Sequence, residues 1–78
     1  MKKQIVKDLL NLKNGELYKI VVNGSNIPYF VGITQDGKNA LMGTFITPEN
    51  LLYKNVHQSR VYNNIIEVIN KLSAWKVL

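Results

Sequence analysis

Two apolar runs separated by an Asp-Gly pair occupy residues 28–43, which read PYFVGITQDGKNALMG. The first run is rich in the β-branched and aromatic side chains that pack well on a pleated sheet. An Asp-Gly pair between such runs favours a two-residue type I′ turn, which joins consecutive antiparallel strands. The predicted hairpin has the cross-strand pairs Thr34 with Asn39, Ile33 with Ala40, Val31 with Met42, and Phe30 with Gly43.

The predicted register gives the hairpin two apolar faces, because side chains alternate between the faces of a strand. One face is an ordinary core surface and carries Val31, Ile33, Ala40 and Met42. The other, called here the hairpin face, carries Phe30, Gly32, Leu41, Gly43 and Phe45. Apolar faces are normally covered by helices, by curling of the sheet or by a partner. We expect the chain's own helices to cover the hairpin face; if they leave it open, it is a candidate site for partner binding or self-association.

The segment before this hairpin predicts a helix followed by a strand. Ile5, Leu9 and Leu12 recur at helical spacing, and Asn14-Gly15 suits a helix C-cap. An alternative makes Asn14-Gly15 a hairpin turn between two strands. From Glu16 the apolar period changes to two, which predicts a strand whose core side carries Tyr18, Ile20 and Val22.

The segment after the hairpin predicts two more helices. Thr47-Pro48-Glu49 is typical of a helix start, with threonine as N-cap and proline at the first helical position, and we expect this helix to run to Lys54. Ser59 is expected to cap a longer helix whose apolar stripe holds Val61, Ile65, Ile69 and Leu72. The tail SAWKVL is expected to be extended, with Trp75 and Val77 on one side, as an edge strand or an ordered terminus.

These elements predict a single α+β domain over residues 1–78, with a three- to four-stranded antiparallel sheet, an N-terminal helix and a C-terminal helix. A chain this short has no room for a second core. An alternative is a sheet curled into a small SH3-like barrel, because Gly32 and Gly43 would permit strong bending. With no cysteine to form a disulfide, a homo-oligomer would be one way to add buried area.

The chemical inventory predicts a non-enzymatic chain. It holds one histidine, two aspartates, three glutamates and no cysteine, all well separated in sequence. His57 and Ser59 lack the third group that orients a catalytic base, and zinc needs more nitrogen or sulfur ligands than the chain offers. No glycine-rich phosphate loop is present. We therefore expect no catalytic residue, no metal and no cofactor.

The net charge of +5 indicates affinity for an anionic partner. A candidate nucleic-acid surface, the predicted basic patch, consists of Tyr53, Lys54, His57, Arg60 and Tyr62. Basic and aromatic side chains together are typical of single-strand binders. The alternative is a solvated loop and helix start whose tyrosines belong partly to the core. Nine of the ten basic residues are lysine, a usage that also fits an AT-rich genome such as that of a phage or mobile element, so the charge itself indicates at most non-specific attraction.

The functional expectation is a binding module that docks on another protein as a regulator, an inhibitor or an assembly factor. Self-association is a second possibility for the same face, and nucleic-acid binding is the alternative function. No apolar run is long enough to cross a bilayer or to serve as a signal peptide, so we expect a cytoplasmic protein that binds no membrane.

Overall fold

The computed structural model describes residues 2–21, 27–44, 46–53 and 59–75. In chain order the elements are α1 (Lys2–Leu10), β1 (Leu17–Ile20), β2 (Tyr29–Ile33), β3 (Ala40–Gly43), α2 (Pro48–Tyr53), β4 (Ser59–Tyr62) and α3 (Ile65–Ala74). The strands form one antiparallel sheet in the order β1-β2-β3-β4. This is the predicted α+β fold, and the barrel alternative is wrong because the sheet stays open.

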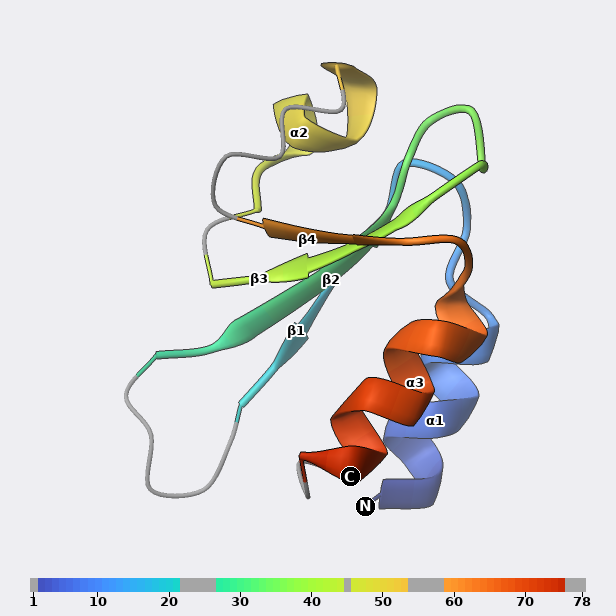
Figure 1. Cartoon of the computed structure of the whole chain (residues 1–78), viewed down its shortest axis with the longest axis vertical. Coiled ribbons are helices and arrows are strands. Elements are labelled where there is room, and N and C mark those ends of the chain that lie inside the picture. Colours follow the sequence, from blue (N-terminus) through green and yellow to red (C-terminus); the bar gives the residue numbers. More distant parts are fainter. Residues whose placement is uncertain (1, 22–26, 45, 54–58, 76–78) are drawn as a thin grey trace.

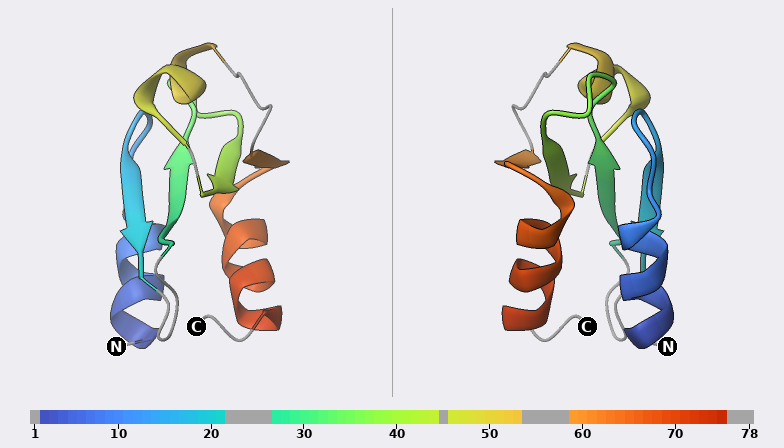
Figure 2. Two further views of the ribbon diagram at one scale, coloured as in Figure 1. Left: turned by 90° about the vertical axis from the view of Figure 1, so that its left-hand side faces the viewer. Right: turned by 90° about the vertical axis from the view of Figure 1, so that its right-hand side faces the viewer.

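The sheet is covered on both faces (Figures 1 and 2). Helices α1 and α3 lie on one face and contact each other, whereas α2 lies on the opposite face near one end of the strands. The core on the α1/α3 side consists of Leu9, Ile20, Val31, Ala40, Met42, Val68 and Leu72. The core on the α2 side consists of Leu41, Ile46 and Leu51, with Leu17 and Phe30 packed against it.

The predicted hairpin register is confirmed pair by pair from Phe30 with Gly43 to Ile33 with Ala40. The turn is wider than predicted, because the last backbone bond of the ladder runs from the Thr34 amide to the Asn39 carbonyl, at 3.0 Å. Asp36 holds the wider loop: its Oδ1 accepts from the Thr34 hydroxyl at 2.7 Å and from the Lys38 amide at 3.0 Å. Gly37 supplies the positive φ of 72° that the loop needs.

The helix predicted at the N-terminus is present, but both interpretations of Asn14-Gly15 are wrong. Helix α1 already ends at Leu10, and no strand precedes the Asn-Gly pair within residues 2–13. The pair lies in a turn in which the Glu16 amide donates to the Lys13 carbonyl at 3.1 Å. Gly15 has φ 78° there, and its amide donates to the Ile33 carbonyl at 2.8 Å, which ties the turn to β2.

The start of α2 is confirmed, with Pro48 as its first residue. Asn50 Oδ1 accepts from the Thr47 amide at 2.7 Å, and the Asn50 amide donates to the Thr47 carbonyl at 3.0 Å. These reciprocal bonds satisfy groups that a helix start leaves open. The helix ends at Tyr53, and the predicted last residue, Lys54, lies outside the described residues.

The helix start predicted at Ser59 is wrong, because Ser59–Tyr62 form β4 and pair with β3. Helix α3 begins at Ile65 with Asn64 as N-cap, whose Oδ1 accepts from the Glu67 amide at 3.1 Å. The Glu67 carboxylate in turn accepts from the Asn63 amide at 2.8 Å. This exchange closely resembles a capping box and fixes the start of α3.

The prediction of an extended tail is also wrong at Trp75. This residue is the C-cap of α3, and its amide donates to the Lys71 carbonyl at 3.0 Å. Val77 lies outside the described residues. In the N-terminal half, the predicted core side of β1 is confirmed at Ile20, which belongs to the α1/α3-side core, and at Tyr18, which packs against that core. Val22 is outside the described residues.

A hydrogen bond ties α1 to β1, because the Tyr18 hydroxyl donates to Asp8 Oδ2 at 2.8 Å. This bond, together with desolvation and the nearby Asp8 charge, raises the pKa of Tyr18 above its usual value of 10.0. The folded protein therefore keeps the Tyr18 proton at a pH at which the unfolded chain has begun to release it.

We expect Tyr18→Phe to lower the free energy of unfolding by about 1 kcal/mol near neutral pH, because Asp8 loses a donor. The Tyr18 contribution is fully present below pH 10 and is lost as pH rises through the raised pKa. Urea unfolding from pH 8 to pH 11 should therefore show the wild-type and Tyr18→Phe stabilities converging above pH 10. A difference that grows with pH would contradict this assignment.

Candidate binding surfaces

The hairpin face is not a free surface, because α2 and Ile46, which lies just before α2, cover its centre. Leu41 has 0% of its surface exposed and packs with Ile46 and Leu51. Gly32 is buried at the same place, where an added Cβ would lie 2.7 Å from Leu51 Cδ2 and 2.9 Å from Leu17 Cδ2. The structure thus meets the expectation of cover by the chain's own helix at these two positions.

The margin of the hairpin face is more open. Phe30 and Gly43 are half-buried, and Phe45 lies outside the described residues. Val61, which pairs with Leu41 across β3 and β4 and so shares its side of the sheet, is 48% exposed, and Leu52 on α2 is 54% exposed. Of the predicted docking surface, Phe30 and Gly43 therefore remain partly accessible. Leu52 and Val61 were not predicted for it, and we call these two residues together with Phe30 the apolar margin near α2.

The predicted basic patch is described only in part. Arg60 lies exposed on β4, whereas Lys54 and His57 are outside the described residues, and Tyr53 is described only as the last residue of α2. Tyr62 packs against the α1/α3-side core, and its hydroxyl is buried with no hydrogen-bond partner in the described part of the chain. The side chain of Tyr62 thus packs largely against the core. The observed neighbours of Arg60 are residues outside the predicted basic patch.

Those neighbours are two aromatic residues that are distant in sequence. The Arg60 Cζ lies over the Trp75 ring, 5.1 Å from its centroid. The Trp75 ring lies 6.5 Å from the Tyr29 ring at an interplanar angle of 44°. Trp75 is 39% exposed, Arg60 is exposed and Tyr29 is half-buried. We call these three residues the Arg60–Trp75 surface.

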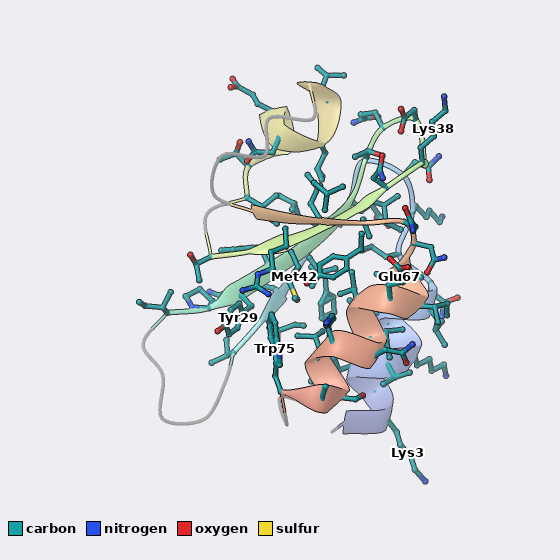
Figure 3. All side chains as sticks on the ribbon, viewed as in Figure 1. Lys3, Tyr29, Lys38, Met42, Glu67 and Trp75 are labelled. Atoms are coloured by element: carbon teal, nitrogen blue, oxygen red, sulfur yellow. The ribbon has the colours of Figure 1, made fainter. Side chains whose placement is uncertain are left out.

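The fold explains why these residues meet. Arg60 pairs with Met42, which belongs to the α1/α3-side core, so the strand register directs Arg60 to the side of the sheet on which α3 lies. Trp75 follows the last residue of α3, and Figure 3 shows its side chain pointing from the helix end toward the sheet, next to Tyr29. Trp75 therefore extends the cover of the sheet beyond the end of α3.

A hollow of about 390 Å³ lies between β4 and α3, the elements that place Arg60 and Trp75. Its lining residues come from β4 and α3 and are Tyr62, Glu67, Asn70, Lys71 and Ala74. Ala74 is adjacent to Trp75 in sequence, and Lys71 lies one helical turn before it. The volume falls at the small end of the range of ligand pockets, roughly 300–1,000 Å³. The hollow is thus large enough for one small planar group.

Three of the described carboxylates, those of Asp8, Glu16 and Glu67, accept hydrogen bonds from neutral donors. Asp8 accepts from Gln4 and Tyr18, Glu16 accepts from the Lys13 amide, and Glu67 accepts from the amide and side chain of Asn63.

Within the described ranges, no three His, Cys, Asp or Glu residues are grouped so that they could hold a metal ion. None of the described helices has the length and apolar character needed to cross a membrane.

Comparison of the chain with protein-family models, with curated proteins and with solved structures finds no match.

Proposed function

We propose that this chain is a non-enzymatic, cytoplasmic binding module that attaches to nucleic acid through the Arg60–Trp75 surface. The observation that carries the proposal is the Arg60 guanidinium, whose Cζ lies 5.1 Å from the centroid of the exposed Trp75 ring, in a chain with a net charge of +5. Cation and aromatic ring together are the combination with which proteins hold nucleic acid without reading its sequence.

The contact with Trp75 favours Arg60 as a phosphate ligand. Contact with the ring face stabilises a guanidinium by about 0.5–1 kcal/mol at an exposed site. A cation–π contact uses none of the N–H donors of the guanidinium in a hydrogen bond, and an arginine can form two parallel bonds to phosphate oxygens. Because Trp75 also contacts Tyr29, the ring under Arg60 is itself held in place.

The rest of the chain adds long-range attraction. Lys3, Lys7, Lys13, Lys19, Lys38 and Lys71 are all exposed. Asp8, Glu16 and Glu67 take hydrogen bonds from neutral groups. A surplus of positive charge therefore draws in a polyanion from all sides, and this attraction is independent of sequence and weakens with salt.

The test is the affinity for a fluorescein-labelled oligonucleotide, followed by fluorescence anisotropy between about 50 and about 200 mM salt. We expect measurable binding that weakens as salt rises, and a loss of about tenfold or more for Arg60→Glu. The matched control is Lys38→Glu, the same charge reversal in the loop between β2 and β3, at the opposite end of the molecule from Trp75 (Figure 3). No binding at about 50 mM salt, or equal losses for both variants, would contradict the proposal.

A second candidate function, docking on another protein as a regulator, an inhibitor or an assembly factor, is favoured by the apolar margin near α2. Leu52 and Val61 are about half exposed there, and the half-buried Phe30 lies on the same side of the sheet. Exposed apolar side chains beside a polar surround are typical of partner-binding sites. Val61→Asp should leave the fold intact and remove such binding.

A further inference from the structure

The position of the hollow beside the Arg60–Trp75 surface narrows the class of ligand. Its lining residues run along α3 from Glu67 to Ala74 and meet Tyr62 on β4, two residues from Arg60. The hollow and the surface therefore adjoin at both of their elements. A ligand that contacts Arg60 can place a neighbouring group into the hollow.

Resting on the proposed nucleic-acid function, we infer that the ligand is a single strand and that one unpaired base enters this hollow. Aromatic side chains contribute to binding when a base face is free to stack, and in a duplex those faces are hidden by neighbouring base pairs. Tyr62 is the aromatic residue that lines the hollow, and the partly exposed Trp75 follows the lining residue Ala74, with Arg60 over its ring. We infer that a base enters at Tyr62 and contacts the part of Trp75 that Arg60 leaves exposed.

The charges around the hollow set the orientation of the nucleotide. Glu67 contributes a carboxylate to the lining, and the C-terminal end of α3 at Ala74 carries the negative end of the helix dipole. Both repel phosphate and accept hydrogen bonds, so they favour the amino groups of a base edge. Lys71 is an exposed cation that lines the hollow, and the exposed Arg60 lies on β4 two residues from the lining residue Tyr62. The base therefore points toward α3, and the phosphate stays outside at Arg60 and Lys71.

The chain supplies its own reporter for this site, because Trp75 is its only tryptophan. Stacking or insertion of a base beside Trp75 should quench its emission. A duplex held only by phosphate contacts should leave the emission nearly unchanged. Site occupancy is thus read from the wild-type protein without a label on it.

The experiment compares a single strand of about 12 thymidines, a length within the usual range of single-strand sites, with a duplex of equal length. The variant Ala74→Leu fills the hollow without changing the charge, and Ser73→Leu is its control, since both residues are exposed at the end of α3 and Ser73 does not line the hollow. We expect Ala74→Leu to weaken single-strand binding by about tenfold and to leave duplex binding unchanged, with no effect of Ser73→Leu on either. Urea unfolding of both variants shows that each is folded.

The possible outcomes separate this inference from the function on which it rests. If duplex and single strand bind equally, or if Ala74→Leu leaves single-strand affinity and Trp75 quenching intact, the single-strand inference is overturned while Arg60-dependent binding stands. If neither nucleic acid binds, both proposals fail. Quenching of Trp75 by polyglutamate but not by oligonucleotides would overturn both and identify an acidic protein as the partner.

Discussion

Leu41→Asp is expected to unfold the protein at 25 °C, although the same change on an exposed sheet face would be tolerated. Leu41 has no exposed surface and lies between the sheet and α2, in contact with the Ile46 and Leu51 core. Truncation of such a leucine to alanine alone costs about 2–5 kcal/mol. An uncompensated carboxylate adds a large desolvation cost, and small domains have only about 5–15 kcal/mol in total. Circular dichroism should show loss of the folded signal without denaturant.

The control for this prediction is Val61→Asp, at the position that faces Leu41 across β3 and β4. Val61 is 48% exposed, so a carboxylate there stays in water and the variant should unfold cooperatively in urea. A folded Leu41→Asp with a wild-type urea midpoint would show that α2 does not cover the sheet. Val61→Asp also tests the second candidate function, since it changes the apolar margin near α2 in a protein that remains folded.

The hairpin could be predicted residue by residue because its register follows from local signals. An Asp-Gly pair centred between two apolar runs fixes which residues face each other, and a wider loop around the same centre keeps every pair. The structure accordingly changes the turn, through the Asp36 hydrogen bonds, and leaves the register as predicted.

The boundary between β4 and α3 could not be predicted from apolar spacing alone. Val61 and Ile65 are four residues apart and fit a helical stripe, yet Val61 lies on a strand and Ile65 begins the helix. The decisive signal is polar. Asn64 followed three residues later by Glu67 is the N-cap pattern, whereas the residue three positions after Ser59 is Tyr62 and not a Glu or Gln. Short apolar segments leave helix and strand ambiguous until a cap is identified.

The aromatic partners of Arg60 in the candidate site could not be predicted from the sequence. Arg60 is the chain's only arginine and can be predicted as a site residue, but the sequence pattern groups it only with residues close to it along the chain. Strand β4 places Arg60 on the same side of the sheet as Tyr29 and next to Trp75 at the end of α3. Both aromatic partners of Arg60 therefore come from segments that are distant in sequence. Only the strand order and the length of α3 bring them together.

Gly32→Val is expected to lower the free energy of unfolding by about 1–3 kcal/mol, the usual cost of overpacking. Any side chain at Gly32 meets Leu51 and Leu17 at less than ordinary contact distance, with Cβ separations of 2.7 and 2.9 Å. The leucine methyl groups can move, but Leu51 is 1% exposed and has little space to move into. Valine's higher strand propensity offsets only part of the cost. Urea unfolding measures the loss, and hydrogen exchange at α2 should show faster opening of that helix.

Lys19→Val is the control, because Lys19 is exposed on the same side of the sheet, where valine has room. If Gly32→Val matched or exceeded the stability of Lys19→Val, the assignment of close packing between α2 and the sheet would be wrong.

Gly32 faces α2, whereas Arg60 and Trp75 lie on the opposite side of the sheet with α3. Changes at well-separated sites act independently, so folded Gly32→Val should bind an oligonucleotide as the wild type does. Loss of that binding would mean that the α2 side of the sheet, with its apolar margin, takes part in holding the ligand.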